Sequence, residues 1–108
     1  MIIQPGEFWV ANIVFTNGIA SKKRPVLVLW LDGNDAVVAV VTSAQSRTPT
    51  DLSLKDWENS GLRVASTVRL SRLVCLTQSL LLVKIGLISQ PDAAKAKEIW
   101  QLYIKPQF

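Results

Sequence analysis

The sequence predicts a mainly β domain that ends in one α-helix. Apolar runs of strand length, rich in β-branched and aromatic residues, fill the first two-thirds of the chain. Clusters of Gly, Asn, Asp and Ser separate these runs, as expected for turns between strands. Helical spacing of apolar residues begins only after Ser89. Because helices do not alternate with the strands, the pattern favours a small, partly closed barrel of five or more short strands over a βαβ fold.

The first half of the chain contains three predicted strands. Glu7–Phe15 mixes aromatic and β-branched residues, and a loop with the sequence TNGIASKK follows at 16–23. Pro25–Leu31 is a continuous apolar run, which predicts a strand buried on both faces. The turn sequence DGND at 32–35 then leads into AVVAVVT at 36–42, and together they predict a hairpin.

The second half begins with a polar loop at 43–50. The sequence DLSL at 51–54 predicts a short edge strand, and the residues after it predict a helical turn that ends at Gly61. Thr67–Leu76 and Leu82–Ile88 are two further predicted strands.

The C-terminal helix has a clear predicted start. Ser89 is a typical N-cap, with Pro91 in the first turn and Asp92 at the third position. Pro106 is expected to break the helix. The expected buried face consists of Ala93, Ala96, Trp100 and either Tyr103 or Ile104.

Length and composition predict one domain over residues 1–108, with one modest core. No uncharged apolar stretch is long enough to span a membrane, and the first residues lack the basic and apolar regions of a secretion signal. A single cysteine, Cys75, offers no internal disulfide. We therefore expect a cytoplasmic protein without membrane association.

The residue types that are missing exclude several kinds of active site. The chain has no histidine, which excludes Ser-His-Asp and Cys-His arrangements and any imidazole acid–base pair. Asp51, Asp56 and Glu58 do not have the spacing of metal ligands, so we expect no metal site and no cofactor. The net charge of +4 favours an anionic partner, either a nucleic acid or an acidic protein segment.

Arg24 is the first candidate site residue. The proline that follows it restricts Arg24 to an extended conformation and is tolerated at the start of a strand. A guanidinium held there is well suited to bind a phosphate, and Lys22 and Lys23 add positive charge nearby. The alternative is a solvated basic loop beside an edge strand.

Thr42 and Ser43 are candidates at the end of the third predicted strand. A hydroxyl at a strand end can donate to a phosphoryl oxygen. Gln45 and Arg47 follow on the same loop, where they could contact bases or phosphates. The alternative is ordinary strand-end and turn chemistry.

A third group lies in STVRLSRL, residues 66–73. Strict alternation would place Arg69 and Ser71 on one face of a strand, with Arg72 on the other face beside Val68 and Leu70. A second arginine in a phosphate pocket is chemically reasonable, and the alternative is an exposed sheet face that carries cations. Tryptophans that could stack on bases are more typical of cores and interfaces; they are Trp9, Trp30, Trp57 and Trp100.

In order and spacing, these elements resemble the MazF/PemK (Kid) family of toxins from type II toxin–antitoxin pairs. The similarity starts with PGEFWVANIVFTNG, continues through SKKRPVLVL and VVTS, and includes GLRVASTVRLSRLVCLTQSLLLVKIGLIS with the helix after it. The resemblance implies an SH3-like barrel with a C-terminal α-helix, usually as a homodimer. It also implies a metal-independent endoribonuclease that cuts single-stranded RNA to a 2′,3′-cyclic phosphate and a free 5′-hydroxyl.

Carried over to this chain, the family's catalytic positions fall on Arg24, Thr42 and Arg69, with Ser43 and Ser71 as supporting groups. PemK-type members have an aspartate where this chain has Ser71, and the loop at 16–23 lacks the Glu or His of some relatives. The resemblance therefore supplies two arginines to stabilise a phosphorane, but no general base.

Two alternatives remain open beside the ribonuclease. One is a family member with weak or no catalysis, which only binds RNA or an antitoxin. The other is a toxin like CcdB that acts by binding a protein, although the chain ends in Lys105-Pro-Gln-Phe108 and not in the Trp-Gly-Ile of that family. For the family partner, we expect an acidic, initially disordered antitoxin tail that folds across the basic cleft.

Overall fold

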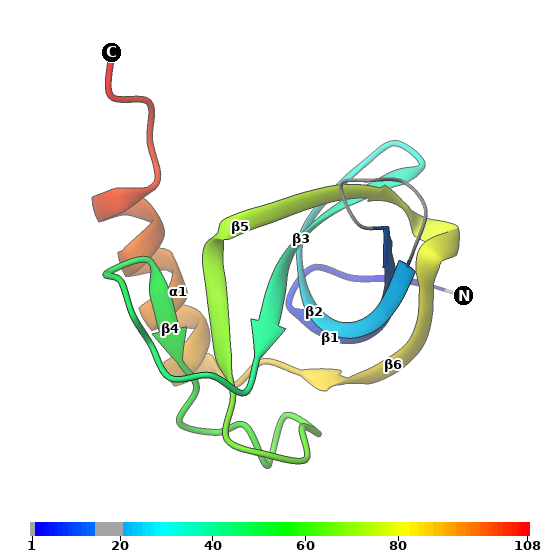
Figure 1. Ribbon diagram of the computed structural model, residues 1–108, viewed down its shortest axis with the longest axis horizontal. Helices are drawn as coiled ribbons and strands as arrows, with labels where there is room; N and C mark the ends of the chain where they lie inside the picture. Colours follow the sequence, from blue (N-terminus) through cyan, green and yellow to red (C-terminus); the bar gives the residue numbers. More distant parts are fainter. Residues whose placement is uncertain (1, 15–20) are drawn as a thin grey trace.

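The computed structural model describes residues 2–14 and 21–108, and Figure 1 shows its arrangement. Within these described ranges, six strands and one α-helix form where apolar runs and the Ser89 cap are found in the sequence. The elements are β1 (Glu7–Val14), β2 (Ser21–Asp32), β3 (Asp35–Thr42), β4 (Asp51–Ser53), β5 (Thr67–Thr77), the 3₁₀ turn η1 (Gln78–Leu80), β6 (Leu81–Leu87) and α1 (Gln90–Tyr103).

The strands form one antiparallel sheet in the order β4-β5-β3-β2-β1-β6. The sheet curls strongly, and α1 lies alongside β4 and β5 (Figure 1). Among the described residues no ladder joins β4 to β6, so the barrel is incomplete. The predicted fold class, a mainly β SH3-like barrel with a C-terminal helix, is confirmed. Within the described ranges, no helix is long and apolar enough to cross a membrane.

Both faces of the central strands are buried, which explains their continuous apolar sequences. Phe8, Leu27 and Ala39 belong to a first core that includes Ile99 of α1. Their chain neighbours point the other way into a second core, whose buried members are Ile3, Trp9, Ala11, Val26, Val28, Ala36, Val38, Leu76 and Leu81.

Two strand predictions need correction, and part of another lies outside the described residues. β2 begins at Ser21 and not at Pro25, so Lys22 and Lys23 are strand residues. The expected burial of the whole Pro25–Leu31 run is wrong at its end, because Trp30 and Leu31 are 41% and 38% exposed near the hairpin tip. Residues 15–20, which include the end of the first predicted strand and most of the predicted loop, lie outside the described residues.

The start of α1 is as predicted. Ser89 Oγ accepts a hydrogen bond from Asp92 N–H at 3.3 Å, and Pro91 lies in the first turn. Asp92 is itself buried and accepts from the backbone N–H groups of Lys55 and Asp56, at 3.1 and 2.9 Å. Of the two alternatives for the last position of the buried face, Ile104 packs against the first core, whereas Tyr103 is 48% exposed.

Glu7 is a buried carboxylate that links β1 to β6. Its Oε1 accepts from Gln4 N–H at 2.8 Å and from Trp9 Nε1–H at 3.1 Å, and its Oε2 lies 2.7 Å from Lys84 Nζ. Burial by itself raises the pKa of Glu7, but the bonds from Lys84, Gln4 and Trp9 outweigh it and lower the pKa below its usual value. The ionised carboxylate therefore stabilises the fold above the pKa of the unfolded chain, and this contribution is lost as the pH falls through the folded-state pKa.

Replacing Glu7 by glutamine is expected to lower the free energy of unfolding by about 1.5–3 kcal/mol at neutral pH, because Lys84 loses its charged partner. The difference from wild type should shrink as the pH falls below the usual pKa of a glutamate and through the lowered folded-state pKa, where the wild-type carboxylate takes up a proton. Urea denaturation at neutral and at acidic pH measures this. Glu98→Gln, in an exposed pair with Lys95, is a matched control with an expected change below about 0.5 kcal/mol. A difference that stayed constant with pH would contradict the expectation.

Candidate active site

The ladder register places three predicted site residues on one face of the sheet. Val40 of β3 lies opposite Val26 of β2 on one side and opposite Arg69 of β5 on the other. Directly opposed residues share a face, as do residues two apart in one strand. Arg24 comes two residues before Val26, and Thr42 comes two residues after Val40. Arg24, Thr42 and Arg69 therefore project from three adjacent strands towards the same side.

Arg24 is half-buried and lies opposite Ala11 of β1. On the other edge of β2, the ladder with β3 starts only at Val26. Pro25 comes before that start, so its missing N–H group removes no hydrogen bond to β3. Lys22 shares the face of Arg24, but Lys23 points to the opposite face. Both lysines are exposed, and only Lys22 can extend the cationic surface beside Arg24.

Thr42 ends β3 with its hydroxyl already fixed in direction. Its Oγ1 accepts a hydrogen bond from Ala44 N–H at 3.2 Å, in the turn that leaves the strand. Because a hydroxyl can accept and donate at once, the Thr42 hydrogen stays available for a ligand. Ser43 follows in the turn and is exposed.

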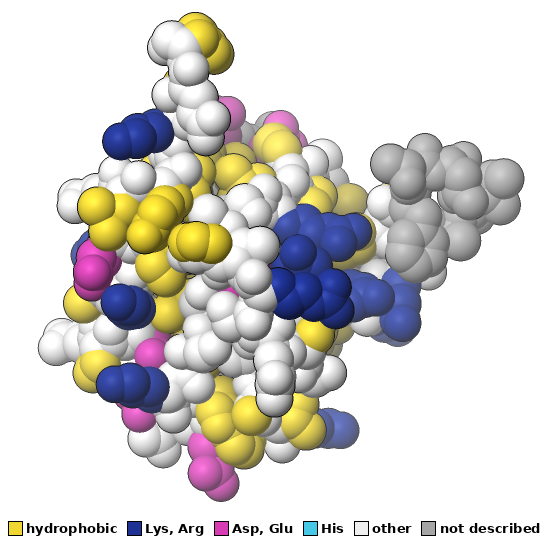
Figure 2. Space-filling model, turned by 60° about the vertical axis from the view of Figure 1, so that its left-hand side comes forward, with side chains coloured by type: hydrophobic (Ala, Val, Ile, Leu, Met, Phe, Trp, Pro, Cys, Tyr) yellow, Lys and Arg dark blue, Asp and Glu magenta, His cyan; other side chains and the backbone are white. Residues whose placement is uncertain are grey.

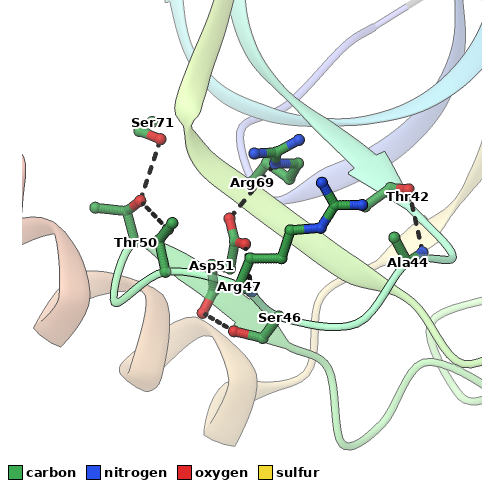
Figure 3. Close-up of polar contacts among 9 residues, drawn as sticks. Thr42, Ala44, Ser46, Arg47, Thr50, Asp51, Arg69 and Ser71 are labelled. Atoms are coloured by element: carbon green, nitrogen blue, oxygen red, sulfur yellow. Dashed lines mark hydrogen bonds and ion pairs between the residues drawn. The ribbon is translucent and has the colours of Figure 1, made fainter.

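The loop at 43–50 carries Gln45 and Arg47, both exposed. Arg47 N–H donates to Asp51 Oδ2 at 2.9 Å, which fixes the loop to the start of β4. In Figure 3 the Arg47 side chain extends from this loop in the direction of Thr42 and Arg69.

Asp51 is the site residue that sequence reasoning missed. It lies opposite Arg69 in the β4–β5 ladder, and its Oδ1 is 3.6 Å from Arg69 Nε. The Asp51 side chain is only 2% exposed, whereas that of Arg69 is 30% exposed. In the sequence the two residues are separated by a loop and a helical turn, so only the strand pairing reveals that they are neighbours. The signal that pointed to Asp51 was its place at the start of a predicted edge strand.

Ser71 does not join Arg69 and Thr42. In the β3–β5 ladder, Val40 pairs with Arg69 and the adjacent Ala39 pairs with Leu73. Residues 70–72 of β5 therefore have no partner on β3, and the strict alternation expected for this strand fails there. Ser71 Oγ accepts instead from Thr50 Oγ1 at 3.1 Å, and it lies on the far side of Asp51 from Thr42 (Figure 3). Arg72 is exposed and does not share the buried environment of Val68 and Leu70.

The tryptophans lie in the core or near α1. Trp9 is buried and bonded to Glu7, and Trp57 packs against the first core. Trp30 and Trp100 meet edge to face, with ring centroids 5.8 Å apart. Trp9 lies opposite Val26, on the same face as Arg24, but its ring is buried and cannot stack on a base. Trp57 contacts the first core, and Trp30 and Trp100 contact each other, as the core-and-interface alternative expects.

Positive charge dominates the candidate site. Lys22, Arg24, Arg47 and Arg69 contribute four cations, against the single buried carboxylate of Asp51. Figure 2 shows one compact group of Lys and Arg side chains on the face that it draws. In the described part of the chain, no three side chains of His, Cys, Asp and Glu converge in a way that could hold a metal ion. The arrangement can therefore bind an anion between arginines and a hydroxyl.

Comparison with known proteins points to one family. The model of the PemK-like, MazF-like toxins of type II toxin–antitoxin systems matches residues 4–103. No curated protein sequence matches the chain.

Solved structures share the fold at low sequence identity. An endoribonuclease from a mycobacterial species, in complex with its cognate antitoxin, is 14% identical with a TM-score of 0.74, over 91% of this chain and 90% of that one. MazF from Deinococcus radiodurans, in a MazE–MazF complex, is 18% identical with a TM-score of 0.73, over 94% and 96%. The Mycobacterium tuberculosis toxin MazF-mt6 is 20% identical with a TM-score of 0.70, over 88% and 93%.

Proposed function

Because the chain belongs to the PemK-like, MazF-like toxins of type II toxin–antitoxin systems, we propose that it is an endoribonuclease that cuts single-stranded RNA at a short sequence. One observation carries the proposal: the register brings Arg24, Thr42 and Arg69 to one face of three adjacent strands. The mycobacterial structural neighbour is an endoribonuclease, which supports the same activity.

In the proposed reaction the 2′-oxygen of a ribose attacks the adjacent phosphorus. The bond from phosphorus to the 5′-oxygen breaks, which leaves a 2′,3′-cyclic phosphate and a free 5′-hydroxyl. The 2′-hydroxyl proton passes to water, and the leaving 5′-oxygen takes a proton from water. No metal ion and no cofactor takes part.

Each site residue has a distinct part in this reaction. Arg24 and Arg69 contact the phosphate and stabilise the extra negative charge of the phosphorane. The Thr42 hydroxyl, held by Ala44 N–H, donates to a non-bridging oxygen. A guanidinium offers N–H donors and no acceptor, so neither Arg24 nor Arg69 removes the 2′-proton.

The surrounding residues bind the RNA. Gln45 and Arg47 contact nucleotides next to the cleaved bond from the 43–50 loop, with Ser43 as a neighbouring hydroxyl. Lys22 extends the cationic surface, and Lys23, on the other face, contributes only to long-range attraction. Ser71 lies apart from Thr42 and is expected to contribute little to catalysis.

We propose a cognate antitoxin with an acidic, initially disordered tail as the protein partner, and a homodimer as the working form. Two structural neighbours were solved as complexes with an antitoxin, which supports the first point. The four cations of the site offer an acidic segment charge-assisted contacts. Binding should weaken steeply as salt rises, and an affinity that does not change with salt would contradict this mode.

The decisive experiment incubates the purified protein with RNA of mixed sequence in EDTA and maps the new ends. Fragments with 2′,3′-cyclic phosphates and 5′-hydroxyls, cut at a recurring sequence, are the expected result. Intact RNA that is still bound would favour the binding-only alternative, and intact unbound RNA would favour a toxin that acts on a protein. Loss of cleavage in EDTA, with recovery on adding Mg²⁺, would overturn the metal-independent mechanism.

A further inference from the structure

We propose that Asp51 is a positioning residue that aligns the Arg69 guanidinium and the 43–50 loop with each other. This inference rests on the proposed ribonuclease function, and it assigns a role to a residue outside the predicted site. Asp51 does not reach the RNA, because its side chain is only 2% exposed.

The two carboxylate oxygens of Asp51 have different partners. Oδ2 accepts from Arg47 N–H at 2.9 Å, at the middle of the loop. Oδ1 faces Arg69 Nε at 3.6 Å, and neither of these two atoms has a hydrogen-bond partner among the described residues. One carboxylate therefore contacts both the loop that carries Arg47 and the arginine proposed to contact the phosphate (Figure 3).

Further bonds connect the same residue to the loop. Asp51 N–H donates to the Thr48 carbonyl at 3.0 Å, and its own carbonyl accepts from Ser46 Oγ at 3.5 Å. Several hydrogen bonds therefore hold the loop to Asp51, while an ion pair holds Arg69 to it. Since the ion pair engages the Nε edge of the guanidinium, the two terminal nitrogens of Arg69 stay available to a phosphate.

A buried carboxylate with one unbonded oxygen is costly to keep in a fold. A neutral residue at position 51 would avoid this desolvation cost. The chain instead has a carboxylate there, directly opposite Arg69 in the β4–β5 ladder. The geometry is that of a fixed charge which preorganises a guanidinium for a transition state.

Asp51→Asn tests the role. The amide keeps an acceptor for Arg47 N–H but removes the charge that faces Arg69. We expect kcat on a mixed single-stranded RNA to fall about tenfold to a hundredfold, as for other small misplacements of a reacting group. KM should stay constant or fall, because D51N removes a negative charge beside the site. Glu58→Gln, which makes the same charge change at an exposed position, should leave both parameters unchanged.

A double variant distinguishes positioning from a general loss of structure. If Asp51 acts through Arg69, then R69A and R69A/D51N should cleave at the same rate within about twofold. A further tenfold loss in the double variant would overturn the proposal, as would wild-type kcat in D51N. Absence of cleavage by the wild-type protein would instead contradict the proposed function, so the two failures are distinguishable.

A measurement on the wild-type chain covers the case in which D51N does not fold. The ¹⁵N relaxation of arginine Nε–H groups reports how restricted each guanidinium is, and Arg69→Lys assigns the Arg69 signal. We expect the Arg69 Nε–H to be as rigid as the backbone and that of exposed Arg72 to be mobile. Equal mobility of the two groups would overturn the proposal.

Discussion

Replacing Arg24 by alanine is expected to slow RNA cleavage by about a hundredfold or more, because one charge-assisted contact that strengthens in the transition state is lost. The effect should fall mainly on kcat, with a smaller increase in KM. The fold should be little affected, since the Arg24 side chain is only half-buried and forms no ion pair among the described residues.

Two comparison variants make the Arg24 result specific. Arg24→Lys keeps the charge but loses the planar two-point contact, so its rate should lie between those of wild type and R24A. Lys105→Ala removes one cation from the C-terminal tail, which extends away from the sheet in Figure 1, and should cleave at the wild-type rate. Rates are measured with the RNA substrate identified by end mapping. Unchanged cleavage by R24A would show that Arg24 lies outside the active site.

Gly86→Ala is expected to destabilise the protein by more than about 3 kcal/mol, because the added methyl group overlaps main-chain atoms. A Cβ at Gly86 would overlap the carbonyl oxygen of Ser60 and lie 2.8 Å from its carbonyl carbon. Ser60 is buried in the turn after β4, and Gly86 is paired with Phe8 in β1. Neither segment can move away without breaking its own hydrogen bonds.

Gly33→Ala is the matched control for this prediction. Gly33 has φ +60° in the β2–β3 turn, and an added Cβ would meet no atom within 4 Å. Only the backbone strain of alanine at positive φ is expected, about 1–2 kcal/mol. Urea denaturation gives both values. If G86A were no less stable than G33A, the close approach of β6 to the Ser60 turn would be wrong.

The sequence predicted the local elements well, because their causes are local. The Ser89 cap, the turn at Gly33 and the two-sided apolar strands each follow from a few neighbouring residues. The burial of Trp30 was mispredicted, and the sequence left the choice between Tyr103 and Ile104 open. Their exposure depends on where the hairpin and α1 end relative to the sheet, which no local pattern contains.

The candidate site was predictable only in part, for the same reason. Arg24, Thr42 and Arg69 came from local motifs and a family resemblance, and their common face follows from the ladder register. The place of Asp51 beside Arg69 was missed, and the expected place of Ser71 on the face of Arg69 was wrong, because both depend on how β5 pairs. The break in the β3–β5 ladder after Arg69 moves Ser71 towards Thr50, while the short β4 brings Asp51 opposite Arg69. The roles of these residues in catalysis stay predictions.

The pairing of β1 with β6 has a consequence for how the chain folds. Glu7 of β1 lies opposite Leu87 of β6. One edge of β1 therefore has no hydrogen-bonded partner strand until β6 has been made. Ile99 of α1, later still in the chain, completes the core around Phe8. Such long-range pairing predicts slow folding and an aggregation-prone interval before closure. During synthesis, the cationic face therefore becomes a stable surface only after β6 and α1 have been made.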